Sequence, residues 1–163
     1  LIATCKTVEE GNYARVAPML LPSNHPLADV DGVYNAVHVK GNMVGSLKFQ
    51  GKGAGKLPTA SAVVADIVDA AKHLHVTIPM YWDQEKLHLM NIDDAPVKFF
   101  IRVASTIQRE QANIERLYGN VTYVTVDSLP NEFAFLTGEF TEREHRDKLT
   151  NVNNVLSKIR TLL

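Results

Sequence analysis

The segment from Thr59 to about Leu74 has the pattern that most constrains how this chain folds. Its apolar side chains recur at helical spacing and form one stripe, made of Val63, Val64, Ile67, Val68 and Ala70. Pro58 favours a helix start at this point, and Thr59 or Ser61 is a candidate N-cap. We therefore predict an amphipathic helix with one face that needs an apolar partner.

Two β-hairpins are predicted before this helix. In residues 1–22 the apolar runs LIATCK and ARVAPMLL flank the polar turn VEEGNY, which is typical of a hairpin. The runs VYNAVHV and GSLKFQ flank Lys40-Gly41-Asn42 and predict the second one. Prolines at positions 18, 22 and 26 disfavour a regular helix over residues 17–27, so we expect extended chain followed by a tight turn there.

The composition changes near residues 75–95, where short apolar pieces alternate with polar ones and end in Asp-Asp-Ala-Pro. We expect a domain boundary in this region. Beyond it the pattern predicts a strand in VKFFIRVA, a helix in TIQREQANIERLYG, strands in VTYVTVDS and EFAFLTGEF, and a last helix over residues 143–163. This β-α-β-β-α order lacks only a final strand to be a ferredoxin-like unit, and both helices are expected on one face of its sheet.

Composition excludes several classes of function. The 17 basic and 18 acidic residues give a formal net charge of −1, so the chain has no strong field for nucleic acid or an anionic membrane. There is no long apolar run or signal peptide, and the only cysteine, Cys5, cannot form an internal disulfide. We expect a protein of the cytoplasm. Because the sequence starts at Leu1 within an apparent strand, we also expect it to be a fragment of a longer protein.

Metal and nucleophile chemistry are not favoured by the sequence. Its histidines lie on different predicted elements, and one cysteine offers no C-x-x-C pair for zinc. A lone cysteine in an apolar strand is more often a small buried hydrophobe than a nucleophile, and this is the interpretation we favour for Cys5.

The glycine-rich turn from Gly51 to Lys56 lies between a predicted strand and the helix, where free amides and flexible backbone can hold an anion. A P-loop is excluded because Gln50 and Leu57 stand where it needs glycine and Ser or Thr. A Rossmann fingerprint is disfavoured because the glycines run G-x-G-x-G and Asp83 lies beyond the usual separation of roughly 20 residues. The remaining alternative is a turn whose glycines only allow close packing.

The ordered motifs HPLADVDGVYNAV and GKGAGKLPTASAVVADIVDAA resemble the second half of the substrate and dimerisation domain of homoserine dehydrogenases, over about residues 1–73. Such enzymes interconvert L-homoserine and L-aspartate 4-semialdehyde with NADP or NAD. The resemblance implies that the glycine turn closes over the cofactor, with Gly55 and, more weakly, Gly53 as cofactor-binding residues. It implies no catalytic residue here, since the family's catalytic lysine and nucleotide-binding loop lie in earlier segments.

The C-terminal part looks like an ACT domain, the regulatory module of many longer homoserine dehydrogenases. Its residues 104–108, ASTIQ, depart from the acidic-Pro-Gly-Val-Leu pattern of amino-acid-binding ACT domains, which puts a response to threonine in doubt. The expected organisation is α+β, a partial mixed-sheet substrate and dimerisation domain (1–80), a linker (81–94) and an ACT-like unit (95–163). We expect a fragment that is inactive alone and forms a homodimer; the alternative is a stand-alone amino-acid-sensing or dimerisation module.

Overall fold

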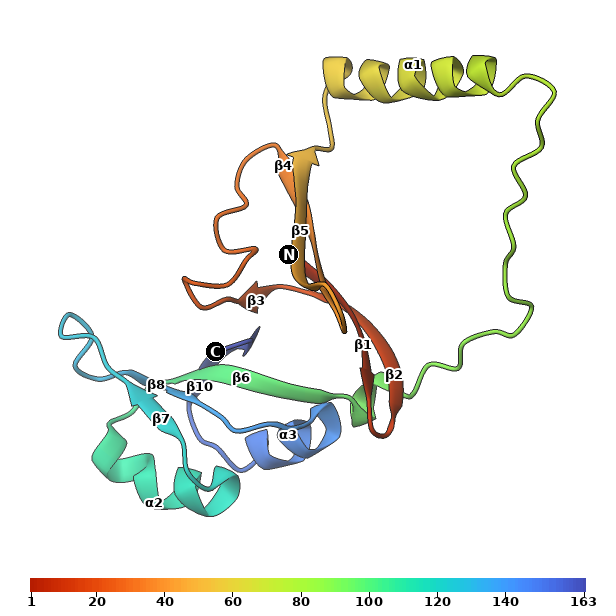
Figure 1. Ribbon diagram of the computed structural model, residues 1–163. Coiled ribbons are helices and arrows are strands. Elements are labelled where there is room, and N and C mark those ends of the chain that lie inside the picture. The colour runs from red at the N-terminus through yellow and green to blue at the C-terminus, as the bar shows by residue number, and fades with distance from the viewer. The chain divides into compact units, whose positions relative to one another are not determined.

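The computed structural model describes residues 1–163, and the chain divides into two compact units (Figure 1). The first unit combines Leu1–Pro22 with Lys86–Leu163, and the second unit comprises Ser23–Glu85. This division differs from the boundaries 1–80, 81–94 and 95–163, because the N-terminal hairpin joins the C-terminal residues. Those domain boundaries stay a prediction.

A ferredoxin-like succession of elements forms most of the first unit. Its elements are β6 (Pro96–Val103), α2 (Ile107–Tyr118), β7 (Thr122–Val124), β8 (Phe133–Leu136), α3 (Glu142–Leu149) and β10 (Val155–Thr161). The strands pair antiparallel in the order β10-β6-β8-β7, and the short β9 (Phe140–Thr141) also pairs with β6. A single 3₁₀ turn, η1 (Ile92–Asp94), precedes β6. Helices α2 and α3 lie on the same face of this sheet, as expected (Figure 1).

The core of the first unit is built on alternation along β6. Every second residue of this strand is buried, from Val97 to Val103, because side chains of a strand point alternately to its two faces. Ile114 and Tyr118 of α2 and Phe135 of β8 close the same cluster. The apolar face of α2 is therefore held against the sheet, and its charged residues face water.

The single helix predicted over residues 143–163 is wrong. Helix α3 ends at Leu149, and β10 begins at Val155. Between them Asn151 donates from its side chain to the carbonyl of Asp147 at 3.1 Å, and Asn154 has φ 55°, a left-handed conformation that asparagine adopts more readily than most residues. The turn sends the chain back across the sheet, so the unit has the final strand that the sequence seemed to lack.

The N-terminal hairpin consists of β1 (Ile2–Val8) and β2 (Gly11–Ala17), paired antiparallel as predicted. The two-residue strand β3 (Met19–Leu20) then pairs in parallel with β10 and extends the sheet by one strand. Residues from the two ends of the chain are therefore hydrogen-bonded neighbours: Leu20 accepts from the amide of Leu162 at 3.0 Å.

Glu142, the first residue of α3, is shared by two arginines and fastens the hairpin to the sheet. Arg160 of β10 donates to its two carboxylate oxygens at 2.6 and 3.2 Å, and Arg15 of β2 lies 3.5 Å away. The side chains of Arg15 and Glu142 are only 7% and 11% exposed. These charges are therefore held in place by each other and by packing, with little solvation.

His145 of α3 is buried among aromatic rings of the core. Phe99, Tyr118 and Phe140 surround it, with ring centroids 4.7–5.9 Å apart within this group. One ring nitrogen, Nε2, bonds the carbonyl of Val97 at 3.0 Å, while Nδ1 has no partner. Burial lowers the pKa of His145 below its usual value of 6.5, against the smaller raising effect of that hydrogen bond.

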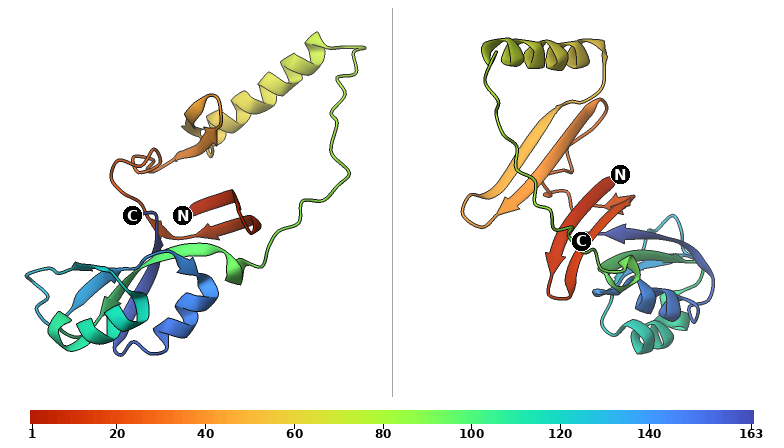
Figure 2. Two further views of the ribbon diagram at one scale, coloured as in Figure 1. Left: turned by 60° about the horizontal axis from the view of Figure 1, so that its bottom comes forward. Right: turned by 90° about the vertical axis from the view of Figure 1, so that its right-hand side faces the viewer.

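The second unit consists of a hairpin, a helix and extended chain. Strands β4 (Tyr34–Gly41) and β5 (Gly45–Lys52) pair antiparallel, as predicted, and helix α1 (Lys56–Lys72) follows. The helix begins before the predicted Thr59, and its N-cap is Gly55, so neither Thr59 nor Ser61 caps it. From His73 to the end of the second unit at Glu85 the chain forms no helix or strand (Figure 2). None of the three α-helices combines the length and the apolar character needed to span a membrane.

Glu142→Gln is expected to destabilise the first unit by about 3–5 kcal/mol, because it leaves two guanidinium groups without their counter-ion in a poorly solvated place. The measurement is urea unfolding followed by the amide NMR signals of β6. The matched control is Glu132→Gln, which breaks the more exposed pair with Arg102, 44% exposed on the arginine side, and should cost about 0.2–1 kcal/mol. Equal losses for the two variants would contradict this account.

Lowering the pH is expected to destabilise the first unit through His145. With its pKa lowered in the folded state, the unfolded chain binds a proton below about pH 6.5 that the folded chain does not, so stability is full above this pH and declines as the pH falls toward the lowered pKa. In His145→Phe this part of the decline should disappear, whereas His88→Phe, at an exposed position, should retain it. Unfolding free energies between pH 7.5 and 5 test this; parallel curves for wild type and His145→Phe would refute it.

Candidate functional site

The glycine turn connects β5 to α1, and its conformation depends on Gly55. Gly55 has φ 125° and ψ 152°, a region that residues with a side chain rarely adopt. Its carbonyl accepts the amide of Thr59 at 3.1 Å, which closes the first turn of the helix. A Cβ built on Gly55 would also lie 3.4 Å from Cδ of Pro58. Only glycine therefore fits the junction without strain.

Gly53 has a packing reason of its own. A Cβ at this position would lie 2.5 Å from Nδ2 of Asn35, which belongs to the paired strand β4. The backbone of the turn therefore lies close to the Asn35 side chain of its own hairpin. A side chain at position 53 would therefore require the exposed side chain of Asn35 to move.

The start of α1 offers two free amides. The first helical residues normally lack intrahelical acceptors for their N–H groups, and here Pro58 has no N–H while that of Thr59 is used by Gly55. The amides of Lys56 and Leu57 remain, and they point out of the positive end of the helix dipole. An anion can be held at this end by backbone groups without any side chain.

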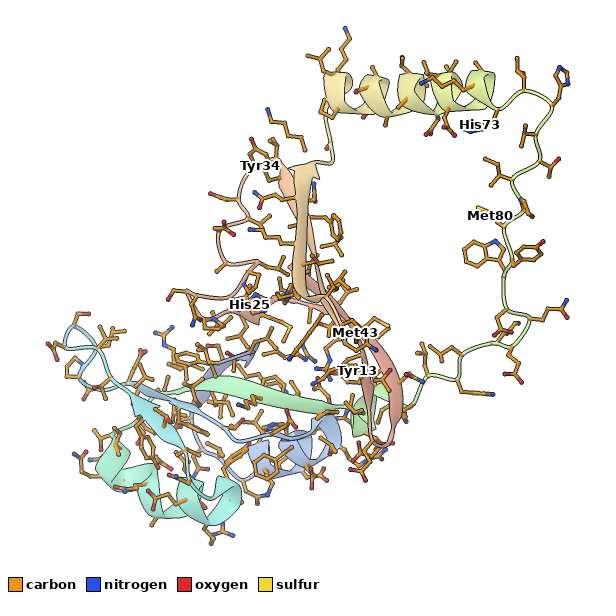
Figure 3. The ribbon with its side chains drawn as sticks, in the orientation of Figure 1. Tyr13, His25, Tyr34, Met43, His73 and Met80 are labelled. Atoms are coloured by element: carbon orange, nitrogen blue, oxygen red, sulfur yellow. The ribbon has the colours of Figure 1, made fainter.

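Two lysines add positive charge to the turn. Lys52 lies over the ring of Tyr34, with Nζ 5.8 Å from the centroid, and Lys56 is exposed at the first position of α1. Figure 3 shows Tyr34 at the end of the hairpin from which the chain enters the helix. Lys48, by contrast, is paired with Asp29, and this hydrogen bond holds the pKa of the Asp29 carboxyl below its usual value. Lys52 and Lys56 thus give the turn a net positive charge.

The histidines and Cys5 form no common site. His38 is hydrogen-bonded to Ser46 at 2.6 Å with the ring of His25 beside it, and His73 contacts Asp69 one helical turn away. No group of three or more potential metal ligands is present. Cys5 is exposed on β1, so its interpretation as a buried hydrophobe is wrong; it lies on the face of the hairpin away from Tyr13 and Arg15.

The sequence interpretation missed the buried charges of the first unit. Arg15, Glu142 and His145 are all at most about one tenth exposed, yet they lie in segments that were expected to be an ordinary strand and a solvated helix start. One signal was available for Arg15: alternation along β2 places it on the same face as Tyr13 and Ala17, both of which are buried.

Comparison by sequence gives a clear relationship for the first part of the chain. The family model for homoserine dehydrogenase matches residues 1–68. The homoserine dehydrogenase of Neisseria gonorrhoeae is 51% identical over 72 residues, which are 44% of this chain and 17% of that protein. The enzyme of Mycobacterium tuberculosis is 49% identical over 78 residues, which are 45% of this chain and 18% of that protein. The matched region is therefore less than a fifth of each of these relatives.

Comparison of structures extends over nearly the whole chain. A homoserine dehydrogenase from Thiobacillus denitrificans matches 96% of this chain with a TM-score of 0.77 and 28% identity, and this chain covers 40% of that one. A homoserine dehydrogenase from S. aureus, with 24% identity and a TM-score of 0.69, shares the fold over 98% of this chain. Residues 1–68 therefore match the homoserine dehydrogenase family, and the chain as a whole has the fold of part of such an enzyme.

Proposed function

We propose that this chain is the C-terminal part of a homoserine dehydrogenase, which interconverts L-homoserine and L-aspartate 4-semialdehyde in the biosynthesis of threonine, methionine and isoleucine. The observation that carries the proposal is the match of residues 1–68, at about half identity to the relatives named above. The catalytic lysine and the nucleotide-binding loop would belong to a preceding segment of the whole protein. By itself the 163-residue chain would be inactive.

The absence of a core in the second unit supports the proposal that this chain is part of a larger protein. None of residues 23–85 is buried, and the apolar stripe of α1 is open, with Ile67 62% exposed. A helix with one apolar face gains most of its stability from a packing partner. In the whole enzyme that partner would be the N-terminal nucleotide-binding domain.

The glycine turn would close over NADP or NAD held by that domain. The bound cofactor supplies the hydride chemistry. The residues of this chain would supply close backbone approach at Gly55, two free amides at Lys56 and Leu57, and the charge of Lys52. Gly55 is the stronger candidate, since its φ of 125° disfavours any side chain, whereas at Gly53 only the side chain of Asn35 would have to move. The sequence and the turn give no preference between the two cofactors.

The ferredoxin-like unit would serve as an ACT-type regulatory module. Its element order is complete, which removes one objection to this role. A response to threonine remains a proposal, and the segment 104–108 still departs from the family's ligand-binding pattern. We further propose a homodimer in the cytoplasm. The alternative, a stand-alone sensing module, has no observation in its favour, since the relatives named above are dehydrogenases.

Restoring the missing N-terminal region is expected to produce activity that the 163-residue chain lacks. The intact native protein should reduce aspartate 4-semialdehyde with NADPH or NADH and oxidise homoserine in reverse, measured by cofactor absorbance. The 163 residues alone should do neither. An intact native protein that is folded and still fails to oxidise homoserine would overturn the proposed function.

In the intact enzyme, Gly55→Ala is expected to raise KM for the cofactor about tenfold to a hundredfold, because the methyl group strains the turn and obstructs close approach. Two controls separate these effects. Gly138→Ala adds a methyl group at an ordinary contact distance of 3.7 Å from Phe140, and Gly119→Ala introduces strain at φ 72°, both in the other unit. Both should leave KM unchanged. A similar KM in all three variants and wild type would remove Gly55 from the cofactor site.

A further inference from the structure

A cavity of about 210 Å³ opens in the first unit between the N-terminal hairpin and the ferredoxin-like sheet. Lys6, Tyr13 and Arg15 line it from the hairpin, and Tyr13, labelled in Figure 3, marks this wall. The sheet contributes Lys98 of β6 and Thr161 of β10. At roughly 30 Å³ for each water molecule, the space holds a ligand of about seven non-hydrogen atoms.

Arg15 lines this cavity, and the protein satisfies its donors only in part. Its two terminal nitrogens lie 3.4 and 3.5 Å from the carbonyl of Pro96, at the long end of the hydrogen-bond range, and its contact with Glu142 is also 3.5 Å. Its Nε is buried and has no partner. Buried guanidinium groups are normally fully hydrogen-bonded, so this side chain has one donor, Nε, without an acceptor and two that are held only at long distances.

The charge of the cavity indicates what that acceptor is. Three cationic side chains, Lys6, Arg15 and Lys98, line the cavity with one acidic side chain, the exposed Glu139, and Lys98 also donates to the carbonyl of Leu163 at 3.2 Å. Glu142, which offsets part of the charge of Arg15, is bound more closely by Arg160. The balance favours an anion, and a planar carboxylate suits the edge of a guanidinium group. The exposed Glu139 disfavours a compact, highly charged anion such as phosphate.

We propose that this cavity binds a small organic carboxylate, with Arg15 and Lys98 as its principal contacts and Lys6 at its opening. The site is separate from the segment 104–108, where the ACT resemblance would place an amino acid. It combines residues 4–19, which belong to the family-matched part, with β6 and β10 beyond that part. A carboxylate bound there ties the hairpin to the ferredoxin-like sheet.

Titration with succinate at constant ionic strength tests the proposal, by calorimetry and by the amide NMR signals of Val97 and Thr161. It needs no dehydrogenase activity, so its failure is distinct from failure of the proposed function. Wild type should bind, and Arg15→Lys and Lys98→Gln should each weaken binding about tenfold or more, since the first loses the planar two-point donor and the second loses a charged donor. Lys40→Gln removes the same charge from an exposed place in the second unit and should bind like wild type.

If Arg15→Lys does not fold, Lys98→Gln and the exposed Lys6→Gln decide the question. Three outcomes overturn the proposal: no binding of succinate by the folded wild type, equal affinity of Lys98→Gln, Lys6→Gln and Lys40→Gln, or binding of inorganic phosphate as tight as that of succinate. Spectral changes confined to residues outside the cavity would likewise overturn it.

Discussion

Strand β6 is the element on which the rest of the first unit depends, because its backbone and its buried face both bind other elements. Its neighbours in the sheet are β10, β8 and β9. Its carbonyl groups also form hydrogen bonds with side chains of other elements. The carbonyl of Pro96 accepts from Arg15, and that of Val97 is bonded to His145. The hydroxyl of Thr137 accepts the amide of Phe99 at 3.0 Å. A shift of β6 by one residue would exchange its buried and open faces and break all these bonds together.

The sequence predicted those parts whose pattern is local. Both hairpins, α1, α2 and the strands β6, β7 and β8 follow from short-range alternation or helical spacing, and all of them are present. The family relationship was also predictable, because the motifs around HPLADVDG and GKGAGKLPTASAVV are long and ordered, and the family model confirms it over residues 1–68. The assignment of Gly55 to a cofactor site rests on that relationship and stays a prediction.

Features that depend on distant partners could not be predicted. The apolar spacing of residues 150–163 suits a helix and also a strand. This segment forms a strand because it pairs with β6 after the turn at Asn154. Burial of Arg15 depends on Glu142, which lies far along the chain on another element. The exposure of Cys5 likewise depends on which face of the hairpin the sheet covers. None of these outcomes is encoded within a window of a few residues.

The parallel pairing of β3 with β10 has a consequence for the order of folding. The contact between Thr161 and Leu20 closes a loop of 141 residues, and the entropy of closing so long a loop must be overcome before the contact contributes. Such non-local pairings form late and slowly. During synthesis β3 must therefore stay unpaired until β10 has left the ribosome. This waiting period is when the chain is most exposed to pairing with other chains or to capture by a chaperone.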